Sequence, residues 1–241
     1  MRNVFRCSLA IIAITVGLGG HVAKAASLVP GDSIIVTGTT SAARPELGGA
    51  VVQDTILSTP NVGVPALPFQ FARFEVQNRV VQSSVDDTMV FMPRILFGSN
   101  VTAGNLLVDR VEMFGFGNFA IDASYRTDGL GDRGPTFASR SADGETLDFS
   151  FGFPLVINNL VSGPQEESYF FALKSDTTAF ENTGRISIFA RAQGDNFNTY
   201  RFDVGGLAVP VAPVPLPASL PLLAFGGLLL ALVRRSRRTA A

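Results

Sequence analysis

Cysteine, histidine and tryptophan are almost missing from this chain. Its 241 residues hold one cysteine, one histidine and no tryptophan. Cys7 and His21 both lie within the first 25 residues, so residues 26–241 contain neither type. That part of the chain can form no disulfide and no Ser-His-Asp or Cys-His catalytic arrangement. Zinc sites built on cysteine or histidine, and haem sites ligated by them, are excluded there as well.

Basic residues are scarce between the two ends. Residues 26–208 contain all 20 acidic residues but 12 of the 19 basic ones, which gives this segment a net charge of −8. An acidic domain repels nucleic acid and anionic membrane surfaces, so we expect no nucleic-acid partner. Lys174 is the single lysine of the segment, so amine-based catalysis has one candidate and no recognisable partner for it.

The first 25 residues have the three-part pattern of a secretion signal. Arg2 and Arg6 precede an apolar run from Leu9 to Leu18, and Ala23-Lys24-Ala25 then places small residues where signal peptidase reads them. We expect signal peptidase to cleave before Ala26 and the chain to be exported across the inner membrane. The apolar run of about ten residues is too short to span a bilayer core of roughly 30 Å.

The C-terminal end combines a spacer, an apolar run and a basic cluster. Four prolines in residues 209–218 favour an extended, stiff spacer. Residues 219–233 are apolar and uncharged, and we expect a transmembrane helix there. The basic tail, residues 234–241, should stay in the cytoplasm by the positive-inside rule, so the helix would anchor the exported chain in the membrane. The stop-transfer charges are Arg234, Arg235, Arg237 and Arg238.

Five residues at the start of this tail form a motif. Val214, Pro215, Leu216, Pro217 and Ala218, followed by the apolar run and the arginines, resemble the VPLPA-type variant of the PEP-CTERM sorting tails of Gram-negative bacteria. The resemblance covers about a tenth of the chain. It implies a substrate of an exosortase, a membrane transpeptidase-like enzyme that recognises the motif and removes the helix. Such proteins are typically exported with exopolysaccharide or biofilm material, which implies a cell-surface or extracellular location after processing.

Residues 26–208 have the pattern of one β-rich domain. Short β-branched and aromatic runs recur between clusters of glycine, proline, asparagine and aspartate, without helical periodicity. The sequence predicts an all-β, antiparallel β-sandwich, jelly-roll-like, flanked by the signal helix and the transmembrane helix. The predicted strands are Ser33–Thr39, Ala50–Leu57, Phe69–Gln77, Met89–Phe97, Leu106–Phe116, Phe119–Tyr125, Leu147–Phe153, Tyr169–Lys174, Arg185–Ala192 and Tyr200–Leu207.

Alternation within these strands predicts which side chains face the core. In residues 185–191, apolar side chains alternate with charged or polar ones, as expected for a strand with one face in water. Phe149, Phe151 and Phe153 fall on one face of another strand. The segment holds 18 phenylalanines and three tyrosines. Because phenylalanine has no polar group to bond sugar hydroxyls, we expect these rings mainly in the core.

Loop 128–134 is the most site-like segment. Asp128 and Asp132 lie four residues apart among glycines, and paired carboxylate oxygens suit calcium. The loop lacks the spacing of an EF-hand, and glycine-aspartate loops are also ordinary hairpin turns. Calcium at this pair is the single cofactor that the sequence suggests. Residues 86–87 and 166–167 are acidic pairs that we expect in solvated turns.

Three functions remain open. The tail and the missing residue types favour a non-enzymatic surface or extracellular-matrix protein, with polysaccharide as a partner and no catalytic residue. A carbohydrate-active hydrolase would need two carboxylates roughly 5–9 Å apart, and no sequence feature selects such a pair. A calcium-dependent binding module is the third alternative.

Overall fold

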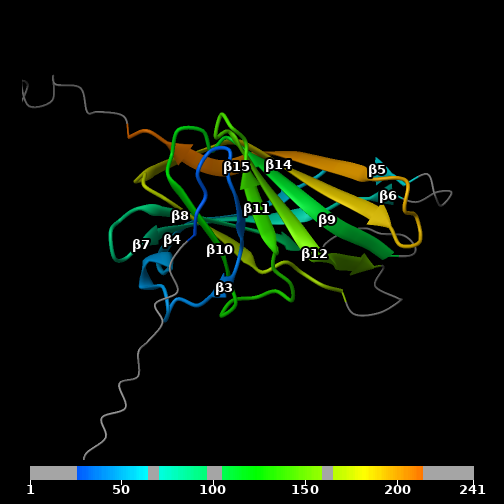
Figure 1. Cartoon of the computed structure of the whole chain (residues 1–241), viewed down its shortest axis with the longest axis horizontal. Coiled ribbons are helices and arrows are strands. Elements are labelled where there is room, and N and C mark those ends of the chain that lie inside the picture. Colours follow the sequence, from blue (N-terminus) through cyan, green and yellow to red (C-terminus); the bar gives the residue numbers. More distant parts are fainter. Residues whose placement is uncertain (1–25, 65–70, 97–104, 159–164, 214–241) are drawn as a thin grey trace, which may run out of the picture.

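The computed structural model describes residues 26–64, 71–96, 105–158 and 165–213. These residues form an all-β domain built from antiparallel sheets (Figure 1). The predicted signal helix, sorting motif and transmembrane helix lie outside the described residues. Among the described residues, the structure contains no helix with the length and hydropathy to cross a membrane.

The first sheet has the strand order β1–β10–β13–β8–β7–β4, and β3 pairs in parallel with β10. Its other neighbouring strands are antiparallel. The strands are β1 (Ala26–Ser27), β3 (Gly38–Thr39), β4 (Gly49–Ser58), β7 (Glu75–Ser83), β8 (Met89–Leu96), β10 (Ile121–Arg126) and β13 (Phe170–Ser175).

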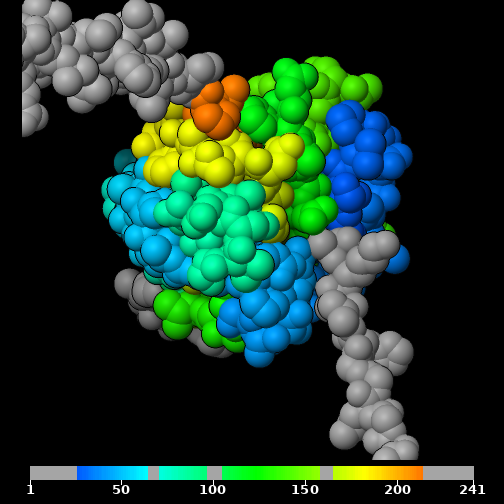
Figure 2. Space-filling model, turned by 90° about the vertical axis from the view of Figure 1, so that its left-hand side faces the viewer, coloured from blue at the N-terminus to red at the C-terminus, as the bar shows by residue number. Residues whose placement is uncertain are grey.

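The second sheet is antiparallel throughout, with the order β15–β14–β9–β12–β11–β2. Its strands are β2 (Ser33–Ile35), β9 (Asn105–Phe114), β11 (Phe137–Arg140), β12 (Thr146–Asn158), β14 (Ala179–Ala192) and β15 (Tyr200–Val211). A short pair, β5 (Val62–Gly63) with β6 (Phe71–Ala72), stands apart from both sheets. The 3-10 turn η1 (Pro45–Leu47) lies beside the β7–β8 hairpin on the outer side of the first sheet (Figure 2).

Phenylalanine rings join the two sheets across one apolar core. Phe149 of β12 meets Phe171 of β13 edge to face, with 5.0 Å between ring centroids. Phe74, just before β7, meets Phe202 of β15 at 4.7 Å. Burying one such side chain contributes about 1.5–3 kcal/mol, so these rings are a main source of stability. The expectation that phenylalanine forms the core is confirmed for Phe74, Phe91, Phe116, Phe149, Phe151, Phe171 and Phe202.

The predicted strands are largely confirmed, with three differences. Ser33–Thr39 is divided between β2 and β3, which belong to opposite sheets, because the chain crosses between the sheets at residues 36–37. Strand β11 lies in a segment for which no strand was predicted. Phe69 lies outside the described residues, and the rest of the predicted strand Phe69–Gln77 is divided between β6 and the start of β7 at Glu75.

The prediction that Phe153 shares the core face of Phe149 and Phe151 is wrong. Phe149 is fully buried, whereas Phe153 is 76% exposed. The register between β12 and β9 shifts between Ser150 and Leu155. A bulge of this kind interrupts the two-residue alternation of side chains, so positions after it no longer follow the face of those before it.

The last strand extends beyond the predicted end of the domain at Ala208. β15 continues to Val211, Val209 is buried, and the Thr177 hydroxyl donates to the Val211 carbonyl oxygen at 2.6 Å. Pro210 fits because β15 is an edge strand, where a missing backbone N–H is tolerated. Residues 209–211 therefore belong to the domain and not to the spacer.

Shortening the chain tests this boundary. We expect the free energy of unfolding to be about 2 kcal/mol lower for a chain that ends after Ala208 than for a chain that ends after Pro213. The shorter chain loses the buried Val209 side chain and the last pairs between β15 and β14. Urea unfolding of the two truncated chains measures the difference, and equal midpoints would contradict the assignment.

Candidate functional site

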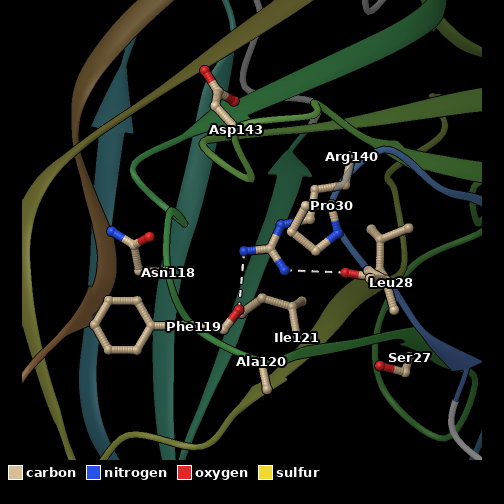
Figure 3. Close-up of a pocket in the computed structure, with 10 residues that line it drawn as sticks. Ser27, Leu28, Pro30, Asn118, Phe119, Ala120, Ile121, Arg140 and Asp143 are labelled. Atoms are coloured by element: carbon tan, nitrogen blue, oxygen red, sulfur yellow. Dashed lines mark hydrogen bonds between the residues drawn. The ribbon is translucent and has the colours of Figure 1, made fainter.

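A pocket of about 330 Å³ lies beside the N-terminal strand of the domain. Its lining comes from residues 27–30, from residues 118–121 and from Arg140 and Asp143. Figure 3 shows the Arg140 guanidinium between the first of these segments and the second. The volume is at the lower end of the range of roughly 300–1,000 Å³ found for small-molecule sites.

Arg140 binds backbone carbonyl groups from three connections of the fold. It is 4% exposed, and its Nε donates to the Gly144 carbonyl at 2.9 Å. Nη1 donates to the Leu28 carbonyl at 3.0 Å, and Nη2 donates to those of Phe116 and Phe119 at 2.6 and 2.9 Å. One side chain thus joins the β1–β2, β9–β10 and β11–β12 connections.

The charge of Arg140 has no carboxylate in contact with it among the described residues. Arg44 and Arg94 are buried to the same degree, and each forms an ion pair, at 2.8 and 2.9 Å. Burial lowers the pKa of Arg140 from its ordinary value, and the negative charge of Glu145 acts in the opposite direction. Because arginine stays protonated even so, the inner end of the pocket is positively charged.

Three other polar side chains line the pocket, Ser27, Asn118 and Asp143. Neither the Ser27 hydroxyl nor the Asn118 amide has a hydrogen-bond partner among the described residues. Asn118 has a left-handed backbone with φ 65°, a conformation that asparagine tolerates better than most residues. The Asp143 Oδ1 atom accepts bonds from the Ser141 hydroxyl and the Glu145 backbone N–H, and Oδ2 accepts neither of these bonds.

These groups suit binding of a small polar anion. Arg140 keeps one N–H that is not bonded to a carbonyl and can bond one carboxylate oxygen, and the amide, hydroxyl and carboxylate of the rim can bond neutral polar groups. Asp143 is the one carboxylate among the lining residues. The pocket therefore lacks the carboxylate pair that glycoside hydrolysis needs.

A second hollow, of about 230 Å³, lies on the outer face of the first sheet. Phe170 lines it, and the guanidinium carbons of Arg79 and Arg94 lie 4.5 and 4.8 Å from the centroid of the Phe170 ring. Arg79 pairs with Asp54 at 2.7 Å, and Arg94 is ion-paired as described above. Since these charges are already compensated, the pocket in Figure 3 is the stronger candidate for an anion.

The two carboxylates expected to bind calcium have separate partners. Asp128 accepts hydrogen bonds from Arg126 and Ser41, the shortest from Arg126 Nε at 2.6 Å. Asp132 accepts one from the Glu167 backbone N–H at 2.8 Å. In the part of the chain that the structure describes, no group of three or more histidine, cysteine, aspartate or glutamate side chains could hold a metal ion. The structure does not bring a third ligand to this pair.

The acidic pairs expected in solvated turns have different outcomes. Asp86 and Asp87 are exposed at the turn after β7, as expected, and Asp86 also lies 2.7 Å from Lys174. Glu166 is half-buried and lies 2.6 Å from Arg133, so the expectation is wrong there. Its basic partner comes from a segment distant in sequence, which the turn pattern does not reveal.

One carboxylate pair faces outward from the second sheet. Glu112 of β9 and Asp148 of β12 are directly paired across the strands, and Nη1 of Arg110 lies 3.0 and 2.8 Å from their carboxylates. Burial raises the pKa of Asp148, and Arg110 lowers it. The pair is thus bridged by an arginine on a sheet surface.

The residues expected to direct processing lie mostly outside the described ranges. Ala26 is the first residue of β1 and pairs with Ala123. The others all lie outside these ranges: Ala23, Ala25, Val214, Pro215, Leu216, Pro217, Ala218, Arg234, Arg235, Arg237 and Arg238.

Known proteins give no parallel. No family model, no curated protein and no solved structure matches this chain. The chemistry of the site is therefore inferred from its own residues.

Arg140 and Asn118 are missing from the residues that sequence reasoning selected. Ala138 and Arg140 alternate with exposed or half-buried neighbours in β11. A strand assignment for Phe137–Arg140 would have placed an arginine on the core face, which is an unusual and informative position. With four residues, this strand is too short to stand out from the loops around it.

Replacing Arg140 tests its role in holding the three connections. We expect Arg140→Met to lower the free energy of unfolding by about 3–5 kcal/mol, because buried carbonyl groups lose their donor. Arg185→Met is the matched control, since Arg185 is exposed and stacks on Phe114; it should cost about 1 kcal/mol or less. Urea unfolding measures both, and equal effects of the two changes would refute the role of Arg140.

Asp128 should make stability depend on pH. The hydrogen bond from Arg126 holds the pKa of Asp128 well below its usual range. The stabilisation is therefore present above the unfolded pKa of about 4 and is lost as the pH falls through the folded pKa. We expect Asp128→Asn to cost roughly 1 kcal/mol at neutral pH and less as the pH falls below about 4.

Asp148 should contribute a pH dependence of stability opposite to that of Asp128. Its pKa is raised in the folded protein, so its titration favours the folded state as the pH falls. Thermal unfolding of wild type, Asp128→Asn and Asp148→Asn between neutral and acidic pH separates the two trends. A constant difference between wild type and Asp128→Asn would show that the Arg126 contact does not stabilise the charged form.

Proposed function

We propose that this chain is an exported, exosortase-sorted surface or extracellular-matrix protein with a non-enzymatic β domain that associates with exopolysaccharide. The order of parts at the C-terminal end carries the proposal. The motif Val214–Ala218 is followed by the apolar residues 219–233 and then by the arginines of residues 234–241. A signal-like segment at residues 1–25 provides the matching export step.

The ends of the strands support this order of processing. β1 begins at Ala26, directly after the expected signal-peptidase site, and β15 ends at Val211, with two residues between it and the motif. Both expected cuts therefore fall outside the paired strands. Release of the domain would leave every described strand intact.

The connections support the finer, jelly-roll-like description of the domain. One sheet contains the run β10–β13–β8 and the other the run β14–β9–β12. Strands that follow each other in the chain, such as β8, β9 and β10, thus alternate between the sheets. Such interleaving is the pattern expected of two wound Greek keys.

The state of the acidic side chains supports a non-enzymatic role. Glu112 and Asp148 share Arg110, and Asp128 is bonded to Arg126. General acid–base chemistry needs a carboxylate placed against a substrate in a concave site. These carboxylates are instead bound to arginines on sheet and turn surfaces.

The intact mass of the protein recovered from its native host tests the sorting proposal. We expect a chain that starts at Ala26, lacks the residues beyond the Val214–Ala218 region and is found at the cell surface or in the medium. A chain that keeps residues 219–241 and stays in the membrane fraction would mean simple anchoring, and the sorting proposal would fail.

A pair of proline variants tests the motif itself. Pro215→Ala with Pro217→Ala should leave the C-terminal segment attached. Pro213→Ala is the matched control, because Pro213 lies between β15 and the motif and should not change processing.

A further inference from the structure

The pocket around Arg140 holds a positive charge that the protein does not neutralise by contact. Among the described arginines that are at least nine-tenths buried, Arg44 and Arg94 each form an ion pair and Arg140 forms none. Its four carbonyl partners satisfy hydrogen bonds but carry no net charge. A buried cation in this state gains from an anion that enters the pocket, because the low local polarity strengthens their attraction.

The guanidinium also has donor capacity left. It has five N–H groups, and four hydrogen bonds to carbonyls account for four of them. The remaining N–H belongs to Nη1, the atom that bonds the Leu28 carbonyl beside the pocket lining (Figure 3). An anion that bonds this N–H would leave the four bonds to carbonyls in place.

The rest of the lining restricts the kind of anion. Asp143 is negative and lies at the same pocket, and the whole domain carries a net charge of −8. Both disfavour a doubly charged group such as phosphate and favour a single negative charge. The Ser27 hydroxyl, the Asn118 amide and the Asp143 carboxylate can bond hydroxyl groups, while Pro30 and Ile121 offer apolar surface.

We propose that this pocket binds one carboxylate-bearing sugar unit, with the carboxylate on Arg140 and sugar hydroxyls on Asn118 and Asp143. The volume of about 330 Å³ suits a group of that size. The choice of a sugar as the source of the carboxylate rests on the proposed association with exopolysaccharide. The anion site itself rests on the geometry of the pocket alone.

Glucuronate and glucose are the probes for this site, since they differ mainly in the carboxylate. We expect glucuronate to bind the purified whole chain at least about tenfold more tightly than glucose, as a charge-assisted bond provides. Isothermal titration measures both. Equal affinities for glucuronate and glucose, or no binding of either sugar, would overturn the proposal. Acetate and inorganic phosphate are added as competitors. If acetate binds as tightly as glucuronate, the site recognises a carboxylate but not a sugar, and the sugar part of the proposal is wrong. If phosphate binds more tightly than glucuronate, the whole proposal is wrong.

Variants locate the binding without disturbing Arg140, whose loss would affect folding. Ala120 is exposed and lines the pocket, so Ala120→Phe should fill it and reduce glucuronate affinity at least about tenfold at unchanged thermal stability. Ala50→Phe is the control, since Ala50 is exposed on β4, away from the pocket lining. Asn118→Gly keeps the left-handed backbone and removes the amide, so it should weaken glucuronate binding. Unchanged affinity in both pocket variants would place the ligand elsewhere.

The outcomes separate this inference from the proposed function. Glucuronate binding in a chain that is not processed at its motif would support the pocket and refute the sorting proposal. A processed chain that binds no glucuronate would do the reverse.

Discussion

The two sheets must stay face to face without a covalent link, because residues 26–241 contain no cysteine. Interlocked phenylalanine rings provide the apolar part of that contact, as between Phe149 and Phe171. Two buried polar side chains complete it. Arg140 joins three connections around the N-terminal strand, and Asn78 of β7 bonds both the Gly206 carbonyl and the Ala208 N–H of β15. Each bonds backbone groups of another segment, so each fixes the position of a connection or an edge strand.

Arginine has a second structural use on the outer face of the second sheet. Arg110 lies 4.1 Å from the centroid of the Phe189 ring, and Arg185 lies at the same distance from Phe114. These contacts cover aromatic rings that point away from the core and keep charged groups at the surface. Phe137 and Ile35, paired across β11 and β2, have no such cover and are 50% and 66% exposed. The high phenylalanine content thus reflects both core packing and arginine-covered surface.

The sequence predicts this fold well where two-residue alternation is unbroken. Ile186, Ile188 and Ala190 of β14 are all fully buried, as their spacing indicates. Prediction fails where the backbone departs from regular pairing, as at the bulge that exposes Phe153. A bulge depends on the partner strand, and a single strand pattern does not contain that information.

The candidate site was not predictable for a related reason. The partners of Arg140 are backbone carbonyls, which every residue possesses, so no residue type marks them in the sequence. They also come from positions as distant as Leu28 and Gly144, which only the folded chain brings together. In contrast, the residues of the proposed sorting motif are contiguous in the chain, so the resemblance can be seen in the sequence alone. A linear motif and a site assembled by folding differ in this way.

The pocket and the export step are linked by the position of the N-terminal strand. Residues 27–30 form part of the pocket wall, and they directly follow the residue at which the mature chain is expected to begin. The wall is held by the bond from Arg140 to the Leu28 carbonyl and by the pairing of Ala26 with Ala123. If the chain is exported as proposed and crosses the membrane unfolded, these contacts form after translocation. The pocket would then be assembled on the side of the membrane where the proposed polysaccharide partner lies.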